Sequence, residues 1–434
     1  MTAHLDRDGF PATRLSAFGR PAAPTTIRKY RVSITANWPQ VMVLPSDRRP
    51  IRVGALYSQT GPTAYVERTQ LNATLLAIDE INRAGGVAGA EVAAITYDAR
   101  CDPETFRALA ERMIEEDGVA LIIGCYMSHT RQAVVPVVER CNAVLAYAAP
   151  YEGFEYSPNV IYGGAVPNQH SLVLARHLTA AGARRFYLVG TRYAFPIEAN
   201  RVMMSLVAER GGQTLAERYV ALQATRPDLA AIVEDIKAKR PDVVFCTVVG
   251  EAAAAFFRLC REAGVGTETV FASLTITEAE VDLIGADLLD GQLTAATYFE
   301  SLQTAANRHF VHSYRARYGE RTHVNAMAET AYSLTHMTLA AAGACGSFNA
   351  RLLRAELANQ TFQAPGGLIR LDPDNSHFYL WPRIARVRTD GHFEILEQSA
   401  APVKPDPYLI QHSLADWDRP PSAADPDGRG SQRA

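Results

Sequence analysis

Two pairs of residues carry side chains that could do chemistry together. Cys125 and His129 are four residues apart across a predicted strand-to-helix turn, where a thiol and an imidazole could form a nucleophile and its base. His309 and His312 are three residues apart on a predicted helix, which would place two metal ligands on one face. A buried thiol beside a histidine near a helix start is the more ordinary interpretation of the first pair. No third ligand stands out near the second pair, so a solvated helix face is favoured there.

The composition of the chain excludes some classes of protein. The chain has 434 residues, of which 48% are hydrophobic and 21% charged, and its formal net charge is −3. This balance lacks the basic surface that direct binding to nucleic acid requires. The mean hydropathy is −0.08, and no apolar run approaches the roughly 18 residues of a membrane span. The length fits two or three globular domains.

The cysteines and the N-terminal residues both indicate in which cellular compartment the protein works. The six cysteines form no CxxC pair, which excludes zinc-ribbon and thioredoxin-like sites, and scattered thiols in a large chain fit a reducing compartment. Residues 1–50 are polar and interrupted by prolines, without the apolar stretch of about 7–15 residues that a secretory signal needs. We interpret them as an extension, or as a start codon assigned too far upstream, and predict a cytoplasmic protein. A periplasmic location is the alternative if the true N-terminus carries a signal peptide.

Strands and helices are predicted to alternate from residue 51 onward. Apolar runs with β-branched residues indicate the strands, and apolar residues at helical spacing indicate the helices. Gly85-Gly86 ends the first helix, and Asp102-Pro103 is typical of the start of the second. The expected strands are 51–57, 92–97, 119–123, 144–147, 186–189, 217–221, 243–248 and 269–272, followed later by 367–371, 384–388 and 392–396. Repeated strand–helix–strand units predict an α/β protein with parallel sheets covered by helices on both faces.

A pause in this alternation divides the chain into two lobes. The pause falls at residues 160–169, where Gly163-Gly164 precedes Pro167. We therefore predict two doubly wound parallel-sheet lobes with a ligand cleft between them, lined by residues that follow the carboxyl ends of strands. The predicted division is a polar extension over 1–50, an N-terminal lobe of 51–164 with 300–360, a C-terminal lobe of 165–299 with 361–417, and a disordered tail over 418–434.

Several long motifs resemble one family of bacterial proteins. The motifs are Gly124-Cys-Tyr-Met-Ser-His-Thr130, Pro136-Val-Val-Glu-Arg140, Pro150-Tyr-Glu-Gly-Phe-Glu-Tyr-Ser-Pro-Asn159, Asp242-Val-Val-Phe-Cys-Thr-Val-Val-Gly250, Ala272-Ser-Leu-Thr-Ile-Thr-Glu-Ala-Glu280, Asp406-Pro-Tyr408 and Asp416-Trp417. They resemble the amide-sensing regulators of bacterial aliphatic amidase operons and, more distantly, the substrate-binding proteins of urea and short-chain-amide transporters. The similarity extends from about residue 52 to residue 417.

This resemblance implies a fold, a function and partners. It implies the type I periplasmic-binding-protein fold, in which two α/β lobes joined by three hinge strands close on a small ligand. In the regulator branch, a cytoplasmic protein holds an RNA-binding antiterminator and releases it when a small amide binds. We accordingly expect a neutral amide or urea-like ligand and an antiterminator protein as partners, and a homodimer. We expect no cofactor, no metal and no direct contact with nucleic acid.

The resemblance also assigns the ligand pocket residue by residue. Ser128 matches a serine at a helix N-terminus that contacts the amide, and its hydroxyl can both donate and accept a hydrogen bond. A helix cap is the alternative role for it. The other matched positions wall the pocket or turn around the ligand: Tyr126, Tyr147, Pro150, Tyr151 and Tyr193.

Two pocket positions depart from the amide sensor. Ala149 stands where the sensor has a threonine, and Phe195 stands where it has a second tyrosine. Each missing hydroxyl removes a possible hydrogen bond worth roughly 0.5–1.5 kcal/mol. The departures therefore predict weaker binding of acetamide-like molecules or a different ligand, and Ala149 leaves room for a bulkier acyl group.

An enzymatic role is the third hypothesis. No G-x-S-x-G sequence occurs, and the four lysines, at positions 29, 237, 239 and 404, leave none beside the predicted cleft for the lysine-dependent amidases. Only a hydrolase that uses Cys125 stays open, and we predict that the chain is not an enzyme. The favoured function is a cytoplasmic amide sensor, and the alternative is the solute-binding component of a urea or short-chain-amide ABC transporter.

Overall fold

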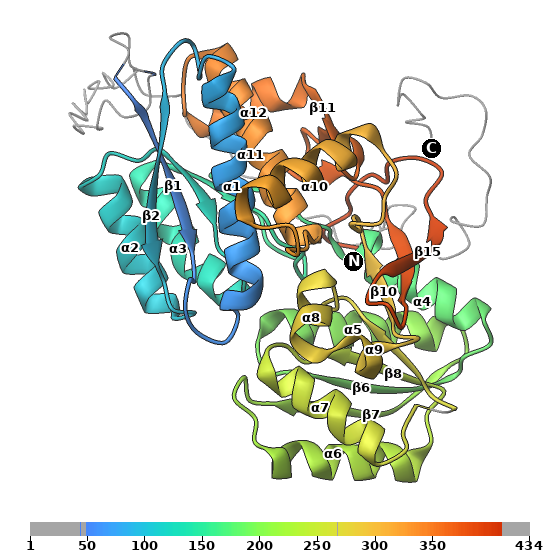
Figure 1. Cartoon of the computed structure of the whole chain (residues 1–434). Helices are drawn as coiled ribbons and strands as arrows, with labels where there is room; N and C mark the ends of the chain where they lie inside the picture. Colours follow the sequence, from blue (N-terminus) through green and yellow to red (C-terminus); the bar gives the residue numbers. More distant parts are fainter. Residues whose placement is uncertain (1–43, 45–48, 267, 410–434) are drawn as a thin grey trace, which may run out of the picture. The chain divides into compact units, whose positions relative to one another are not determined.

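The structure, a computed structural model, describes residue 44 and residues 49–266 and 268–409. The predicted N-terminal extension, apart from residues 44, 49 and 50, lies outside the described residues. So do residues 410–417 and the predicted tail over 418–434. Strands and helices alternate over residues 51–147 and 185–296, as the hydrophobic pattern predicts, and helices followed by short strands complete the described chain (Figure 1).

A five-stranded parallel sheet is built from the first part of the chain, with the order β2-β1-β3-β4-β5. Its strands are β1 (Ile51–Tyr57), β2 (Val92–Asp98), β3 (Leu121–Gly124), β4 (Val144–Tyr147) and β5 (Val160–Tyr162). Its helices are α1 (Ala64–Arg83), α2 (Pro103–Glu115) and α3 (Ser128–Cys141), with α10 (Ala305–Tyr318), α11 (Ala326–Cys345) and α12 (Ala350–Ala358) from later in the chain. Because α11 packs against α1 and α12 against α11, the later helices join this sheet, and we call the whole the first lobe.

Local sequence explains where these elements begin. The Asp102 carboxylate accepts a hydrogen bond from the backbone N–H of Thr105, and Pro103 occupies the first helical position of α2, as the sequence predicts. Ser128 does not cap helix α3. Met127 is the N-cap of α3, and Ser128 is its first helical residue. At the end of β3, a Cβ on Gly124 would lie 2.2 Å from the carbonyl oxygen of Leu56, so the approach of β1 to β3 requires glycine there.

A seven-stranded sheet follows, with the order β15-β14-β10-β9-β8-β6-β7. The strands are β6 (Arg185–Thr191), β7 (Gln213–Val220), β8 (Val243–Thr247), β9 (Val270–Ser273), β10 (Leu293–Ala296), β14 (Arg383–Val387) and β15 (Phe393–Gln398). The helices are α4 (Ser171–Ala180), α5 (Ala194–Glu209), α6 (Arg226–Lys239), α7 (Glu251–Glu262), α8 (Glu278–Ile284) and α9 (Ala286–Leu289). We call this group the second lobe. Strands β6 to β10 pair in parallel, as predicted, and β14 and β15 add an antiparallel edge to the sheet.

Helices cover both faces of the second sheet. Phe186 and Leu188 of β6 pack with apolar residues of α4 and α5, whereas Tyr187 and Val189 of the same strand belong to a different apolar cluster that includes residues of α6 and α7. Successive side chains of a strand point to opposite faces, which explains this division. Both faces are therefore buried, as the continuous apolar runs of the sequence indicate.

A small antiparallel sheet and several connecting segments lie where the chain passes between the lobes. The small sheet contains β11 (Thr361–Ala364), β12 (Gly367–Leu371) and β13 (Phe378–Tyr379), and a bridge pairs Tyr162 of β5 with His377. The predicted pause at residues 160–169 is wrong in its first part, because residues 160–162 form the edge strand β5. The lobe boundaries at residues 164, 299 and 360 stay an interpretation of this topology.

Candidate functional site

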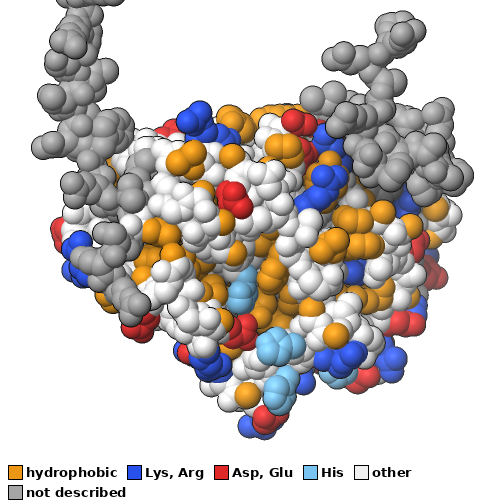
Figure 2. Space-filling model, turned by 90° about the horizontal axis from the view of Figure 1, so that it is seen from above, with side chains coloured by type: hydrophobic (Ala, Val, Ile, Leu, Met, Phe, Trp, Pro, Cys, Tyr) orange, Lys and Arg blue, Asp and Glu red, His pale blue; other side chains and the backbone are white. Residues whose placement is uncertain are grey.

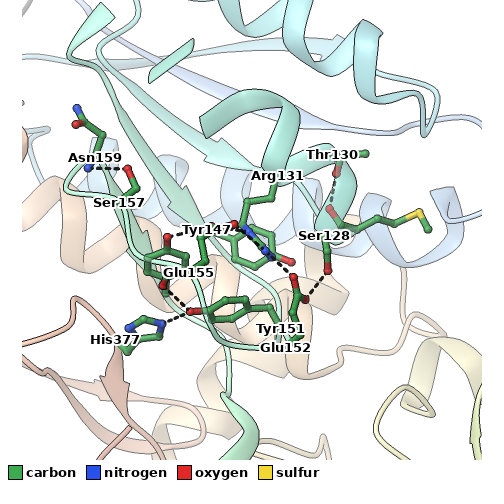
Figure 3. A network of polar contacts seen from close by, with 12 residues as sticks. Ser128, Thr130, Arg131, Tyr147, Tyr151, Glu152, Glu155, Ser157, Asn159 and His377 are labelled. Carbon is green, nitrogen blue, oxygen red and sulfur yellow. Dashed lines mark hydrogen bonds and ion pairs between the residues drawn. The ribbon is translucent and has the colours of Figure 1, made fainter. Parts of the chain in front are cut away.

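The candidate site is built at the carboxyl ends of β3 and β4. The chain leaves β3 through Cys125, Tyr126 and Met127 and enters α3 at Ser128, which is buried. The Ser128 hydroxyl donates to Oε2 of Glu152 at 2.6 Å, so it holds a carboxylate that lies in the loop after β4 (Figure 3). Ser128 thus makes a side-chain contact of its own at this sheet edge, and it does not cap the helix.

Arg131 lies at the centre of the site, three residues beyond Ser128 on α3, and is 0% exposed. Its Nη2 donates to Glu152 Oε1 at 2.8 Å and its Nε donates to Glu155 Oε1 at 2.9 Å. Burial by itself lowers the pKa of Arg131, but Tyr147 and the two carboxylates outweigh burial and leave this pKa above its ordinary value. The cluster therefore contains one buried cation and two carboxylates.

Aromatic rings enclose the guanidinium. Its central carbon lies 4.8 Å from the ring centre of Tyr147 and 4.6 Å from that of Tyr151, which are distances of cation–π contact. The Tyr147 hydroxyl donates to the backbone oxygen of Tyr126 at 2.7 Å. Nη1 of Arg131 is buried and has no hydrogen-bond partner among the described residues. Tyr147, the last residue of β4, and Tyr151 of the following loop thus both pack on the arginine.

Tyr151 continues into a stack of rings. Its ring lies on that of Tyr162, with centres 5.1 Å apart, and the Tyr162 ring lies on that of His377 at 4.4 Å. The Tyr151 hydroxyl lies 2.6 Å from Nε2 of His377, and the Tyr162 hydroxyl donates to Glu155. Burial lowers the pKa of His377 to about 4, so its ring is neutral at pH 7. Tyr151 therefore links the arginine cluster to the segment next to β13.

The second lobe contributes Tyr193, which precedes α5 at the carboxyl end of β6. Its ring lies edge-on to that of His129 of the first lobe, with centres 5.8 Å apart. Burial raises the pKa of the Tyr193 hydroxyl, and the nearby charges of Tyr147, Glu152 and Glu280 raise it further. The structure therefore brings Tyr193 toward the same group of side chains that Ser128 belongs to.

Ala149 and Phe195, two of the predicted pocket positions, lie outside the arginine cluster. Ala149 is fully buried, and its backbone oxygen lies so close to Gly164 that a Cβ there would be 2.0 Å away. Phe195 is buried in the apolar cluster of α4 and α5, with its ring centre 6.1 Å from that of His170. Pro150, which is half-buried, separates Ala149 from Tyr151. Phe195 thus packs among the apolar side chains of α4 and α5, and its role in a ligand pocket stays a prediction.

Sequence reasoning missed a contact between the lobes. The hydroxyl of Tyr65 on α1 donates to Oε1 of Glu280 on α8 at 2.8 Å, across 215 residues of sequence. Burial raises the pKa of Glu280. Burial also raises the pKa of Tyr126, and the nearby charges of Tyr65 and Glu280 raise it further. Sequence reasoning also missed Arg131, which lies three residues beyond Ser128 on helix α3, because this spacing alone does not show that an arginine is buried.

The Cys125–His129 pair lies next to this site but is not activated for catalysis, and the His309–His312 pair lies away from the site. Cys125 is buried in the apolar core of the first lobe, and burial raises the pKa of its thiol, which keeps it protonated and a poor nucleophile. Burial lowers the pKa of His129. His309 is 65% exposed beside Glu80, at 3.4 Å. In the described ranges no group of three or more His, Cys, Asp or Glu residues could hold a metal ion.

Comparison with known proteins gives the family. Residues 51–414 match the family described as "Periplasmic binding protein domain". The chain belongs to this family. It has the type I periplasmic-binding-protein fold, which confirms the predicted fold class. None of the helices in the described residues is long and apolar enough to cross a membrane.

The chain is similar to several known proteins, of which three are described here. The chain is 23% identical over 285 residues to Leu/Ile/Val-binding protein homolog 6 of Brucella melitensis, covering 64% of this chain and 72% of that protein. It is 30% identical over 126 residues to limonene hydroxylase of Geobacillus stearothermophilus, covering 29% of this chain but only 23% of that protein. A solute-binding protein of an ABC transporter from Rhodopseudomonas palustris BisB5, solved with 3,4-dihydroxybenzoic acid, superposes with a TM-score of 0.74 at 21% identity. That superposition covers 82% of this chain and 99% of the other.

Proposed function

We propose that this protein is the solute-binding component of a transporter and that its ligand is a small neutral molecule with N–H groups, such as a short-chain amide or urea. The ligand would lie between Ser128 and Tyr126 of the first lobe and Tyr193 of the second. The solute-binding relatives of ABC transporters favour this function over gene regulation, and they favour the periplasmic alternative over the cytoplasmic location.

One observation carries the choice of ligand: two carboxylates face one buried guanidinium. Glu152 and Glu155 occupy Nη2 and Nε of Arg131, so the cation is already paired. A carboxylate ligand placed beside Ser128 would add a third negative charge where one guanidinium already pairs with two carboxylates, which is unfavourable at low dielectric. The carboxylate of Glu152 is instead suited to accept hydrogen bonds from the N–H groups of an amide or urea.

The relatives would lead one to expect the opposite kind of ligand, one that carries a carboxylate. The Brucella protein is named for leucine, isoleucine and valine, and the Rhodopseudomonas protein was solved with 3,4-dihydroxybenzoic acid, all of which carry a carboxylate. Calorimetric titration should therefore compare acetamide, propionamide and urea with acetate, leucine and 3,4-dihydroxybenzoate. We expect saturable heat from an amide or urea and none from the carboxylates. Tighter binding of any carboxylate would show that the Glu152–Arg131 pair opens for it, and our assignment of the ligand would be wrong.

The amide-sensing regulator is the second candidate, and the motifs at residues 124–130 and 150–159 favour it. It shares the proposed ligand but differs in location and partner. The cytoplasmic location, the RNA-binding antiterminator and the homodimer stay predictions. Fractionation of the native host and affinity purification with and without the best amide decide between the two. Permease subunits and a periplasmic pool support the transporter, whereas an RNA-binding protein that amide releases supports the regulator.

A further inference from the structure

Two segments that are far apart in the sequence meet at the candidate site. One is the loop after β4, which carries the site carboxylates Glu152 and Glu155 (Figure 3). The other is the segment of residues 405–409, which contains the Asp-Pro-Tyr motif of the sequence. The backbone N–H of Phe154 donates to the carbonyl oxygen of Pro407 at 2.9 Å. The second segment therefore contacts the loop at its middle, between the two carboxylates.

The loop turns sharply between these carboxylates. Gly153 has φ +79° and Phe154 has φ +59°, so two consecutive residues adopt the left-handed conformation. A left-handed phenylalanine is uncommon and costs free energy, so neighbouring contacts must hold it there. On either side of this turn, Glu152 and Glu155 both pair with Arg131. The contacts that hold Phe154 in this conformation therefore also hold the two carboxylates.

The 405–409 segment fits the turn closely. A Cβ on Gly153 would lie 2.1 Å from the carbonyl oxygen of Pro407, which is buried, so only glycine permits this approach. The ring of Phe154 lies edge-on to that of Tyr408, with ring centres 6.4 Å apart, which is a favourable aromatic geometry. The same segment thus holds Phe154 both at its N–H and at its ring.

The ring of Phe154 also contacts the second lobe. The guanidinium carbon of Arg201, on α5, lies 5.5 Å from the centre of this ring, within the range of a cation–π contact. Phe154 is 48% exposed, and other apolar side chains are exposed on the surface as well, as the face in Figure 2 shows. Its exposure is therefore ordinary, and its backbone conformation and its contacts with Arg201 and Tyr408 are what set it apart.

The 405–409 segment is itself anchored. The side-chain amide of Asn168 donates to the carbonyl oxygen of Lys404 at 2.8 Å and accepts from the N–H of Asp406 at 2.9 Å. Asn168 is buried, which favours keeping both hydrogen bonds. Leu409 packs against the apolar cluster of α4 and α5 in the second lobe. The segment therefore joins the site loop of the first lobe to helices of the second lobe.

We propose that residues 405–409 act as a clamp on the ligand site, which holds Phe154 in its left-handed conformation and so positions the carboxylates on either side of it. Phe154 is a positioning residue and acts through Glu152. Loosening the clamp should weaken ligand binding although each side chain that contacts the ligand is unchanged. Because this role of the clamp rests on the proposed function, the order of the loop and the affinity for ligand are measured separately.

The first test adds one methyl group under the clamp. Gly153→Ala places a Cβ against the carbonyl oxygen of Pro407, whereas Gly118→Ala, at φ +71° with nothing within 4 Å, has similar backbone strain without the clash. Hydrogen–deuterium exchange of the ligand-free chain, followed by mass spectrometry, reports the order of the loop. We expect faster exchange over residues 151–157 in Gly153→Ala and parent-like exchange there in Gly118→Ala. Unchanged exchange in Gly153→Ala overturns the proposal.

The second test measures affinity by calorimetric titration with acetamide, propionamide and urea. We expect Gly153→Ala to weaken binding of the tightest of these ligands roughly tenfold, the effect of losing one hydrogen bond to a charged group, and Gly118→Ala to bind as the parent does. Parent-like affinity in Gly153→Ala overturns the clamp and leaves the proposed function standing. If the parent binds none of the three, the proposed function fails, and the exchange experiment alone decides whether the clamp holds the loop.

A milder variant serves if Gly153→Ala does not fold. Tyr408→Ala removes only the ring that packs on Phe154, and we expect faster exchange of the loop and roughly three- to tenfold weaker binding. Tyr408→Phe keeps the ring and should restore both, which a general loss of stability would not explain. Parent-like exchange and affinity in Tyr408→Ala, or no rescue by Tyr408→Phe, contradicts the proposal.

Discussion

Removing the buried cation of the candidate site is the most direct test of how that site is held together. In Arg131→Met, Glu152 and Glu155 lose the guanidinium that pairs with both of them. Breaking a buried ion pair by removing one partner costs about 3–5 kcal/mol, because the remaining charge stays buried. Loss of the cation–π contacts with Tyr147 and Tyr151 adds about 0.5–2 kcal/mol. We expect a loss of about 3.5–7 kcal/mol in the free energy of unfolding, a large share of an ordinary protein's stability.

Urea denaturation followed by circular dichroism gives the free energy of unfolding for each variant. The triple variant Arg131→Met/Glu152→Gln/Glu155→Gln should recover about half or more of the loss, because no unpaired charge is then buried. Arg140→Met, at an exposed arginine of the same helix, is the matched control and should change stability little. A loss below about 1 kcal/mol in Arg131→Met, or no recovery in the triple variant, would refute the electrostatic account.

Three further changes test individual side chains. Ser128→Ala should weaken amide binding by about 0.5–1.5 kcal/mol without unfolding the chain, and unchanged calorimetric affinity would remove Ser128 from the site. Phe195→Tyr should lower the free energy of unfolding by about 1–3 kcal/mol, because it buries a hydroxyl in the apolar cluster of α4 and α5. A gain in acetamide affinity instead would support the amide-sensor role of this position. Burial raises the pKa of Glu278 to about 8, so this group makes stability fall as the pH rises from about 5 to 8. Glu278→Gln should make that fall smaller in denaturation curves, and an unchanged pH profile would contradict the burial argument.

The amino-acid sequence determined the elements of this protein to a large extent. The expected strands 51–57 and 144–147 have the bounds of β1 and β4, and Asp102 caps α2 as predicted. These features depend on periodicity and on contacts between residues a few positions apart, which the local sequence contains. The short strand β5 escaped prediction because three residues give too little periodicity to separate a strand from a loop.

The tertiary structure decided which of these elements meet and what the site contains. Tyr65 and Glu280 form a hydrogen bond although 215 residues separate them, and β14 joins β10 as an antiparallel strand from nearly 90 residues further along the chain. Arg131 became the buried centre of the site only because the loop after β4 returns Glu152 and Glu155 to it. No local pattern distinguishes such an arginine from one on a solvated helix face, because the partners that permit its burial are supplied by the fold.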